Sequence, residues 1–166
     1  MSPQRSLEPI RYLGIDPGTT RIGYGVIQSI QGNLSPITWG IIENPGVNDA
    51  LDKQHTLEAM GKLIAEHKPA RAAVERLFFM NNQKTAMSVS EMRGVILVAL
   101  AQGSIPVTEL NPLQVKQSVC GHGGAGKQQV HDMVRMILGI KVKITPDDAS
   151  DALALALCAA TASQQY

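Results

Sequence analysis

The 166-residue chain lacks most features of secreted, zinc-binding and membrane proteins. Its two cysteines, Cys120 and Cys158, have neither Cys-x-x-Cys spacing nor neighbouring histidines, so we expect two reduced thiols, with Cys158 in the core. No apolar run approaches the roughly 20 residues that a membrane-spanning helix needs. The N-terminal segment MSPQRSLEPIRY lacks the apolar stretch of a secretory signal. These absences predict a cytoplasmic protein without membrane association.

The chain has no large excess of positive or negative charge, since its formal net charge is +1. The charged residues are nevertheless distributed unevenly along the sequence. Residues 1–110 sum to zero, residues 111–143 to +4 and residues 144–166 to −3. A basic segment that runs into an acidic cluster suits a polyanion held beside a metal site. On charge alone, a solvated helix face is the simpler explanation.

Hydrophobic periodicity predicts an α/β fold with alternating elements in the second half. The predicted strands are 11–16, 22–30, 37–43, 70–75 and 105–110, and the predicted helices are 49–67, 83–102, 113–119, 128–138 and a last one that begins at Thr145-Pro146. The second and third strands join through a hairpin turn at residues 31–33. A three-strand meander followed by helix–strand–helix–strand implies a mixed five-stranded sheet with helices on its faces. We expect one domain over 1–166, with its core at about 11–160.

Two acidic residues end predicted strands. Asp16 follows a buried strand and precedes Pro-Gly, so its side chain is expected at the carboxyl edge of the sheet, although an Asx-turn would also explain it. Glu75 ends the apolar strand AAVE, where an unpaired carboxylate would be costly. It therefore needs either an arginine or a cation, and the adjacent Arg76 would point to the opposite face.

Two further acids lie at the head of the last helix. With Thr145 as N-cap and Pro146 at the first helical position, Asp148 falls in the first turn, where the helix dipole alone would account for it. Asp151 lies three residues later on the same helix face and directly precedes an apolar run. It is beyond the capping positions, so a structural role explains it poorly. Together the four carboxylates form a set of hard oxygen ligands that suits Mg²⁺ or Mn²⁺. Two such ions would support phosphodiester hydrolysis.

The segments GIDPGTTRIGYGVI, VERLFF, QVKQSVCGHGGAGKQQVHDMV and DDASDALALAL, in that order over about residues 11–160, closely resemble the RuvC family of Holliday junction resolvases. This resemblance implies a ribonuclease H-like fold, a homodimer, and metal-dependent symmetrical nicking of four-way DNA junctions in recombination and repair, beside a junction-migrating helicase complex. It places the family's catalytic acids at Asp16, Glu75, Asp148 and Asp151. Some members carry His at the third position, where this chain has Asp148, and the neighbouring Asp147 leaves that assignment open to a shared role.

The resemblance also implies DNA contacts. Phe78, one of two phenylalanines, would probe the bases near the cut, whereas Phe79 is expected in the core. Lys116 and Lys127 match the family's basic residues near the scissile phosphate. The stretch GHGGAGK between them is one residue short of a phosphate-loop motif and Gln128 replaces its Ser/Thr, so no nucleotide cofactor is expected.

Two alternatives remain open at this point. A nuclease of the same fold that processes ribosomal RNA precursors shares a similar first strand, but the continuous agreement over the later motifs argues against it. A junction-binding module that does not cut is disfavoured because four clustered carboxylates repel DNA unless a cation intervenes. Paired cuts call for paired active sites. The family's example then implies that part of the helix at 83–102 lies at a dimer interface.

Overall fold

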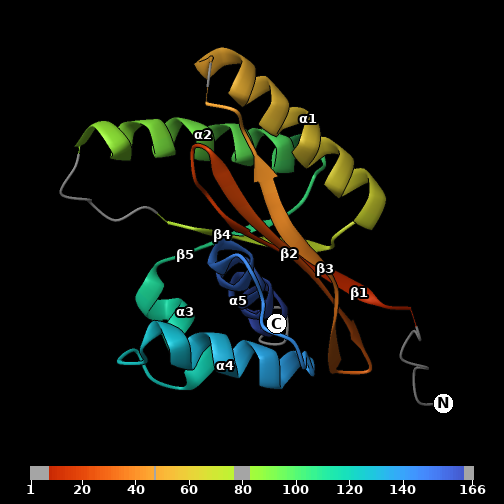
Figure 1. Ribbon diagram of the computed structural model, residues 1–166. Helices are drawn as coiled ribbons and strands as arrows, with labels where there is room; N and C mark the ends of the chain where they lie inside the picture. The colour runs from red at the N-terminus through yellow and green to blue at the C-terminus, as the bar shows by residue number, and fades with distance from the viewer. Residues whose placement is uncertain (1–7, 47, 77–82, 163–166) are drawn as a thin grey trace.

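The computed structural model describes residues 8–46, 48–76 and 83–162. Five strands form one sheet in the order β3-β2-β1-β4-β5 (Figure 1). The strands are β1 (Ile10–Asp16), β2 (Arg21–Ile30), β3 (Asn33–Glu43), β4 (Arg71–Glu75) and β5 (Val107–Leu110). The meander β1–β3 is antiparallel, whereas β4 runs parallel to both β1 and β5. The predicted mixed five-stranded sheet is therefore confirmed.

Five helices connect and cover the strands at the predicted places. They are α1 (Asp49–His67), α2 (Gln83–Gln102), α3 (Pro112–Cys120), α4 (Lys127–Leu138) and α5 (Asp147–Ala162). Asn111 caps α3 in a reciprocal pair of hydrogen bonds with Gln114, and Pro112 occupies the first turn, as the Asn-Pro sequence indicated. Within the described ranges, no helix is both long and apolar enough to cross a membrane.

Several predicted boundaries differ from the structure; the strand expected at 105–110, for example, begins at Val107. The strand expected at 37–43 begins at Asn33, because Pro36 lies on the edge strand β3, where a missing backbone N–H is tolerated. The last helix begins at Asp147, so Thr145 is not its N-cap and Pro146 is not its first residue. The hairpin between β2 and β3 is tighter than expected. Only Gln31 and Gly32 form its turn, both with positive φ, as a two-residue turn of this kind requires.

The sheet separates two apolar cores (Figure 1). On one face Leu13, Ile15 and Val74 pack against α1 and α2. On the other face Tyr12 and Ala73 pack with α3, α4 and the almost wholly buried α5. Neighbouring residues of a strand point to opposite faces of the sheet. Asp16 in β1 and Glu75 in β4 therefore point to the same face as Tyr12 and Ala73, which is the face that α5 covers.

Glycines in β1 and β2 let α5 lie directly on the backbone of the sheet. A Cβ atom at Gly14 would lie 1.9 Å from the carbonyl oxygen of Ala152, and one at Gly23 would lie 2.0 Å from that of Asp148. Only a residue without a side chain fits at such distances. This close approach brings the first turns of α5 to the ends of β1 and β4.

Candidate active site

The first half of the site comes from the two central parallel strands. Ile15 of β1 pairs with Val74 of β4, so the next residue of each strand, Asp16 and Glu75, emerges side by side on the α5 face. The negative charge of Glu75 lies close enough to Asp16 to raise the pKa of the Asp16 carboxyl. Arg93 donates its Nε–H to the main-chain carbonyl of Glu75 (3.2 Å), and its guanidinium pairs with Glu109. Of the two partners that the sequence allowed for Glu75, an arginine or a cation, this geometry favours the cation.

The second half comes from the start of α5. Asp148 and Asp151 lie one helical turn apart, and both carboxylates are close enough to Asp16 to raise its pKa. Asp147 points instead to Lys127, whose Nζ lies 3.4 Å from its Oδ2. The structure thus brings together all four acids that the sequence singled out, and it favours Asp148 over Asp147 as the third member.

Electrostatic crowding is the main property of this cluster. Burial, and then the negative charges of Glu75, Asp151 and Asp148, raise the pKa of the Asp16 carboxyl to about 8. Burial, followed by the charge of Asp151, also raises the pKa of Glu75. Without cations, Asp16 and Glu75 are most stable when their two carboxylates share one proton, as in other carboxylate pairs that cannot both ionise.

Three basic side chains hold the two α5 carboxylates, and the sequence reasoning missed two of them, Arg21 and His131. Arg21, at the start of β2, lies 2.8 Å from Asp148. His131 of α4 places its Nε2 2.9 Å from Oδ1 of Asp151, and Lys127 lies 3.4 Å from the other oxygen. His131 is one helical turn after Lys127 in the sequence, and that spacing was the signal that could have identified it.

The chemistry of this donor set fits hard divalent cations, because it consists of carboxylates so crowded that one retains a proton near neutral pH. Among the described residues, however, no three His, Cys, Asp or Glu side chains form a group that could hold a metal ion as they stand. Asp148 and Asp151 face basic partners instead. A carboxylate has more lone pairs than its basic partners use, so a bound cation would share Asp148 and Asp151 with these partners.

A cavity of about 270 Å³ opens beside the acids, and its lining includes Glu75, Asp151, Lys116 and Lys127. Nearby carboxylates outweigh burial and raise the pKa of Lys127, so it stays charged. The cavity is thus suited to an anionic group that meets both the acids and two ammonium groups. Phe78 and Phe79 lie outside the described residues, so their predicted roles are untested.

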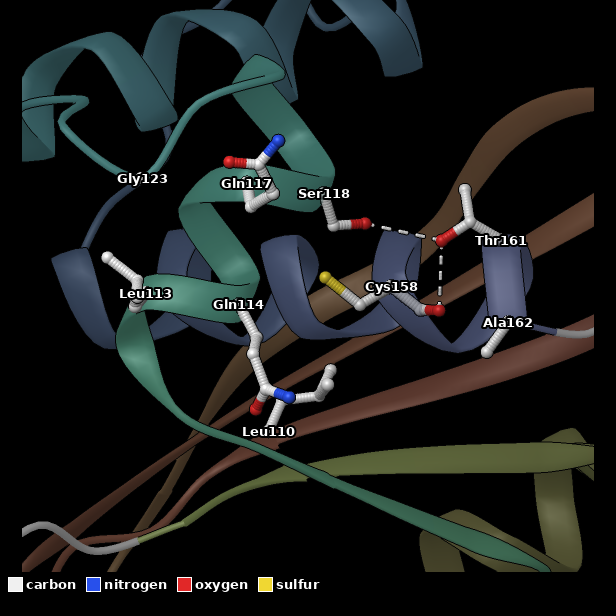
Figure 2. Close-up of a pocket in the computed structure, with 9 residues that line it drawn as sticks. All are labelled: Leu110, Leu113, Gln114, Gln117, Ser118, Gly123, Cys158, Thr161 and Ala162. Carbon is white, nitrogen blue, oxygen red and sulfur yellow. Dashed lines mark hydrogen bonds between the residues drawn. The ribbon is translucent and has the colours of Figure 1, made fainter.

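A larger cavity, of about 630 Å³, lies between α3 and the C-terminal part of α5 (Figure 2). Leu110, Leu113 and the Cys158 thiol line it, while Ser118 and Thr161 contact each other through their hydroxyls at 3.3 Å. None of its lining side chains carries a formal charge, so it offers no ligand for a metal and no counter-charge for phosphate. Cys158 is a buried free thiol, as predicted.

Known proteins match nearly the whole chain. Residues 12–159 match the family described as crossover junction endodeoxyribonuclease RuvC. The chain is 46% identical over 150 residues to the enzyme of that name from Syntrophomonas wolfei, covering 90% of this chain and 87% of that protein. It is 44% identical over 149 residues to the enzyme of that name from Roseiflexus sp., covering 89% of each.

Solved structures also match the chain. The structure of Thermus thermophilus RuvC in complex with a Holliday junction substrate matches with a TM-score of 0.87 at 32% identity, covering 93% of this chain and 95% of that one. The yeast mitochondrial Holliday junction resolvase matches with a TM-score of 0.62 at 15% identity, which supports the fold alone.

Proposed function

Because the chain belongs to the RuvC family of crossover junction endodeoxyribonucleases, we propose that it resolves Holliday junctions by metal-dependent hydrolysis at Asp16, Glu75, Asp148 and Asp151. It is a nuclease of the ribonuclease H-like fold, and its substrate is the four-way DNA junction. What supports the assignment of the site is that Glu75, Asp148 and Asp151 all lie close enough to Asp16 to raise the pKa of its carboxyl, at the sheet edge where β1 and β4 end.

The four acids would hold the metal, with Asp16 and Glu75 as the buried pair and with Asp148 and Asp151 supplied by α5. Bound Mg²⁺ or Mn²⁺, as two ions per site, supplies an activated water and stabilises the charge of the transition state. The chain itself orients these ligands, since His131 and Lys127 hold Asp151 and Arg21 holds Asp148. Lys116 and Lys127, which line the same cavity as Glu75 and Asp151, would bind the phosphate that is cut.

A homodimer would supply two active sites for two symmetrical cuts. In support, α2 exposes Met87 and Val98, which lie three helical turns apart on one side of the helix. Apolar side chains repeated in this way are suited to an isologous contact between two copies. The partnership with a junction-migrating helicase complex and the cytoplasmic location stay predictions, and both follow from a role in recombination.

Cleavage of a synthetic four-way junction tests the proposal. Wild-type protein with Mg²⁺ or Mn²⁺ is expected to nick two strands at symmetrical positions, whereas Asp151→Asn is expected to bind the junction without cutting it. Asp132→Asn is the matched control, because it removes the same charge from an exposed position on α4 and leaves the four acids intact. Full cleavage by Asp151→Asn, or equal losses in both variants, would contradict the proposed site.

The same assay separates the two alternatives. A junction-binding module would bind the DNA in every variant and cut it in none. A ribosomal RNA nuclease would cut structured RNA in preference to the junction. The relatives at 44–46% identity are crossover junction endodeoxyribonucleases, which favours the DNA junction.

A further inference from the structure

A second polar cavity lies between α4, the loop that follows it and the start of α5. This α4–α5 pocket has a volume of about 540 Å³. The side chains that matter for its chemistry are those of Lys127, His131, Arg135, Lys143, Asp147 and Ser150. Lys143 and Ser150 have no part in the cleavage site described above, and Arg135 contacts none of its acids.

The pocket carries an excess of positive charge. Lys127, Arg135 and Lys143 outnumber the one carboxylate of its wall, Asp147, and that carboxylate is itself paired with Lys127 at 3.4 Å. Such a wall repels a metal cation and attracts an anion. Its charge and polarity also disfavour an apolar ligand.

The hydroxyl of Ser150 is the clearest sign that something binds here. Ser150 is fully buried, and its Oγ has no hydrogen-bond partner within the described part of the chain. A buried hydroxyl without a partner costs about 1–3 kcal/mol. An alanine would fill the same space without that cost. A donor held in this state is suited to an acceptor oxygen supplied by a ligand.

The backbone on both sides of Lys143 is held in place by neighbouring residues. Arg135 donates its Nε–H to the carbonyl of Val142 and its Nη2–H to that of Lys141, both at 3.0 Å. Ile144, directly after Lys143, is 3% exposed and belongs to the core. The loop is therefore anchored on both sides of Lys143, which limits the entropy lost when that side chain binds a ligand.

The α4–α5 pocket adjoins the cleavage site. Lys127 lines both this pocket and the cavity beside Glu75 and Asp151. His131 lines the pocket while its Nε2 contacts Asp151. A DNA strand whose phosphate lies at the acids therefore passes the mouth of the pocket when it continues beyond Lys127.

We propose that the α4–α5 pocket binds a backbone phosphate of the cut DNA strand, next to the phosphate at the acids, through Lys143 and the Ser150 hydroxyl. The choice of DNA as the ligand of this pocket rests on the proposed function. Arg135 contributes charge and fixes the loop, and the pocket sets the direction in which the strand leaves the cleavage site. It thereby helps to align one phosphodiester bond with the acids.

The test measures binding of a fluorescent four-way junction, without divalent cations, over a series of salt concentrations. The variants are Lys143→Gln and Ser150→Ala. Lys141→Gln is the matched control, because this exposed lysine belongs to the same loop but does not line the pocket. We expect Lys143→Gln to weaken affinity about fivefold to tenfold and to reduce the salt slope by about one, with Lys141→Gln within about twofold of wild type.

Ser150→Ala gives an independent readout. Removal of an unpaired buried hydroxyl should leave the midpoint of thermal unfolding unchanged or raise it, while junction affinity falls about threefold or more. A lower midpoint with unchanged affinity would mean a purely structural hydroxyl and would overturn the proposal. Equal losses for Lys143→Gln and Lys141→Gln would overturn it as well, because they would show a diffuse attraction.

The proposed function is judged separately, by cleavage of the same junction by wild-type protein in Mg²⁺. Cleavage without any effect of Lys143→Gln or Ser150→Ala on binding would reject the pocket alone. The expected binding pattern without cleavage would support the pocket and reject the proposed function.

Discussion

Replacement of Gly14 by alanine tests how far the active site depends on the close contact between α5 and the sheet. The added Cβ would lie 1.9 Å from the Ala152 oxygen and 2.4 Å from the Ala156 nitrogen, and both atoms belong to the backbone of α5. No side-chain rotation relieves such contacts, so the helix must move outward by roughly 1 Å or more to restore ordinary separations of about 3.5 Å. Asp148 and Asp151 move with it.

Overpacking of a core typically costs about 1–3 kcal/mol, and we expect Gly14→Ala at the upper end because rigid backbone is displaced. A misplacement of about 1 Å in a catalytic group can lower a rate about 100-fold. Urea unfolding and junction cleavage measure the two effects. Gly25→Ala is the milder variant, since its nearest contacts, the Leu153 side chain at 2.8 Å and the Leu153 backbone nitrogen at 2.9 Å, are longer than those at Gly14. It keeps the comparison informative if Gly14→Ala fails to fold.

Gly61→Ala is the control. Gly61 lies in α1, and a Cβ there meets nothing within 4 Å, so alanine should raise the free energy of unfolding by about 0.5–1 kcal/mol and leave cleavage unchanged. Wild-type stability and cleavage in Gly14→Ala would refute the argument, because α5 would then not rest on the sheet as described.

Three further predictions concern the site. The pKa of Asp16 is about 8 in the folded protein against 3.8 ordinarily, so the folded state retains a proton that the unfolded state loses. Without divalent cations, the free energy of unfolding should therefore fall by at most about 6 kcal/mol between about pH 4 and pH 8, and Asp16→Asn should flatten this slope in urea titrations. In calorimetry, His131→Ala should weaken Mn²⁺ binding about tenfold, whereas His131→Gln, which can still donate to Asp151, should largely restore it. Equal losses of Mn²⁺ affinity in the two variants would contradict a positioning role. Phe78→Ala should reduce cleavage more than junction binding, and equal reductions would count against base probing.

Much of this architecture could be predicted from the sequence because its signals are local. Apolar periodicity defined every strand and helix, and the position of Asp16 and Glu75 at strand ends indicated a common sheet edge. The register that joins them, Ile15 to Val74, follows from the parallel pairing of β1 and β4. An unpaired acid at the end of an apolar strand was informative because burial makes it costly.

The partners of the acids could not be predicted, because tertiary packing determines them. Arg21 lies at the start of β2 and reaches Asp148 only because Gly23 allows α5 to approach. His131 reaches Asp151 across the contact between α4 and α5. The strand predicted at 37–43 left out residues 33–36, although the edge strand β3 includes Pro36.

Titration of the protein with Mn²⁺ in a calorimeter tests the central claim most directly. If the four carboxylates form one site for divalent cations, wild-type protein binds the ion and Asp16→Asn loses about tenfold or more in affinity, while Asp132→Asn binds as wild type does. Binding that is equally strong in wild type and Asp16→Asn would contradict the claim.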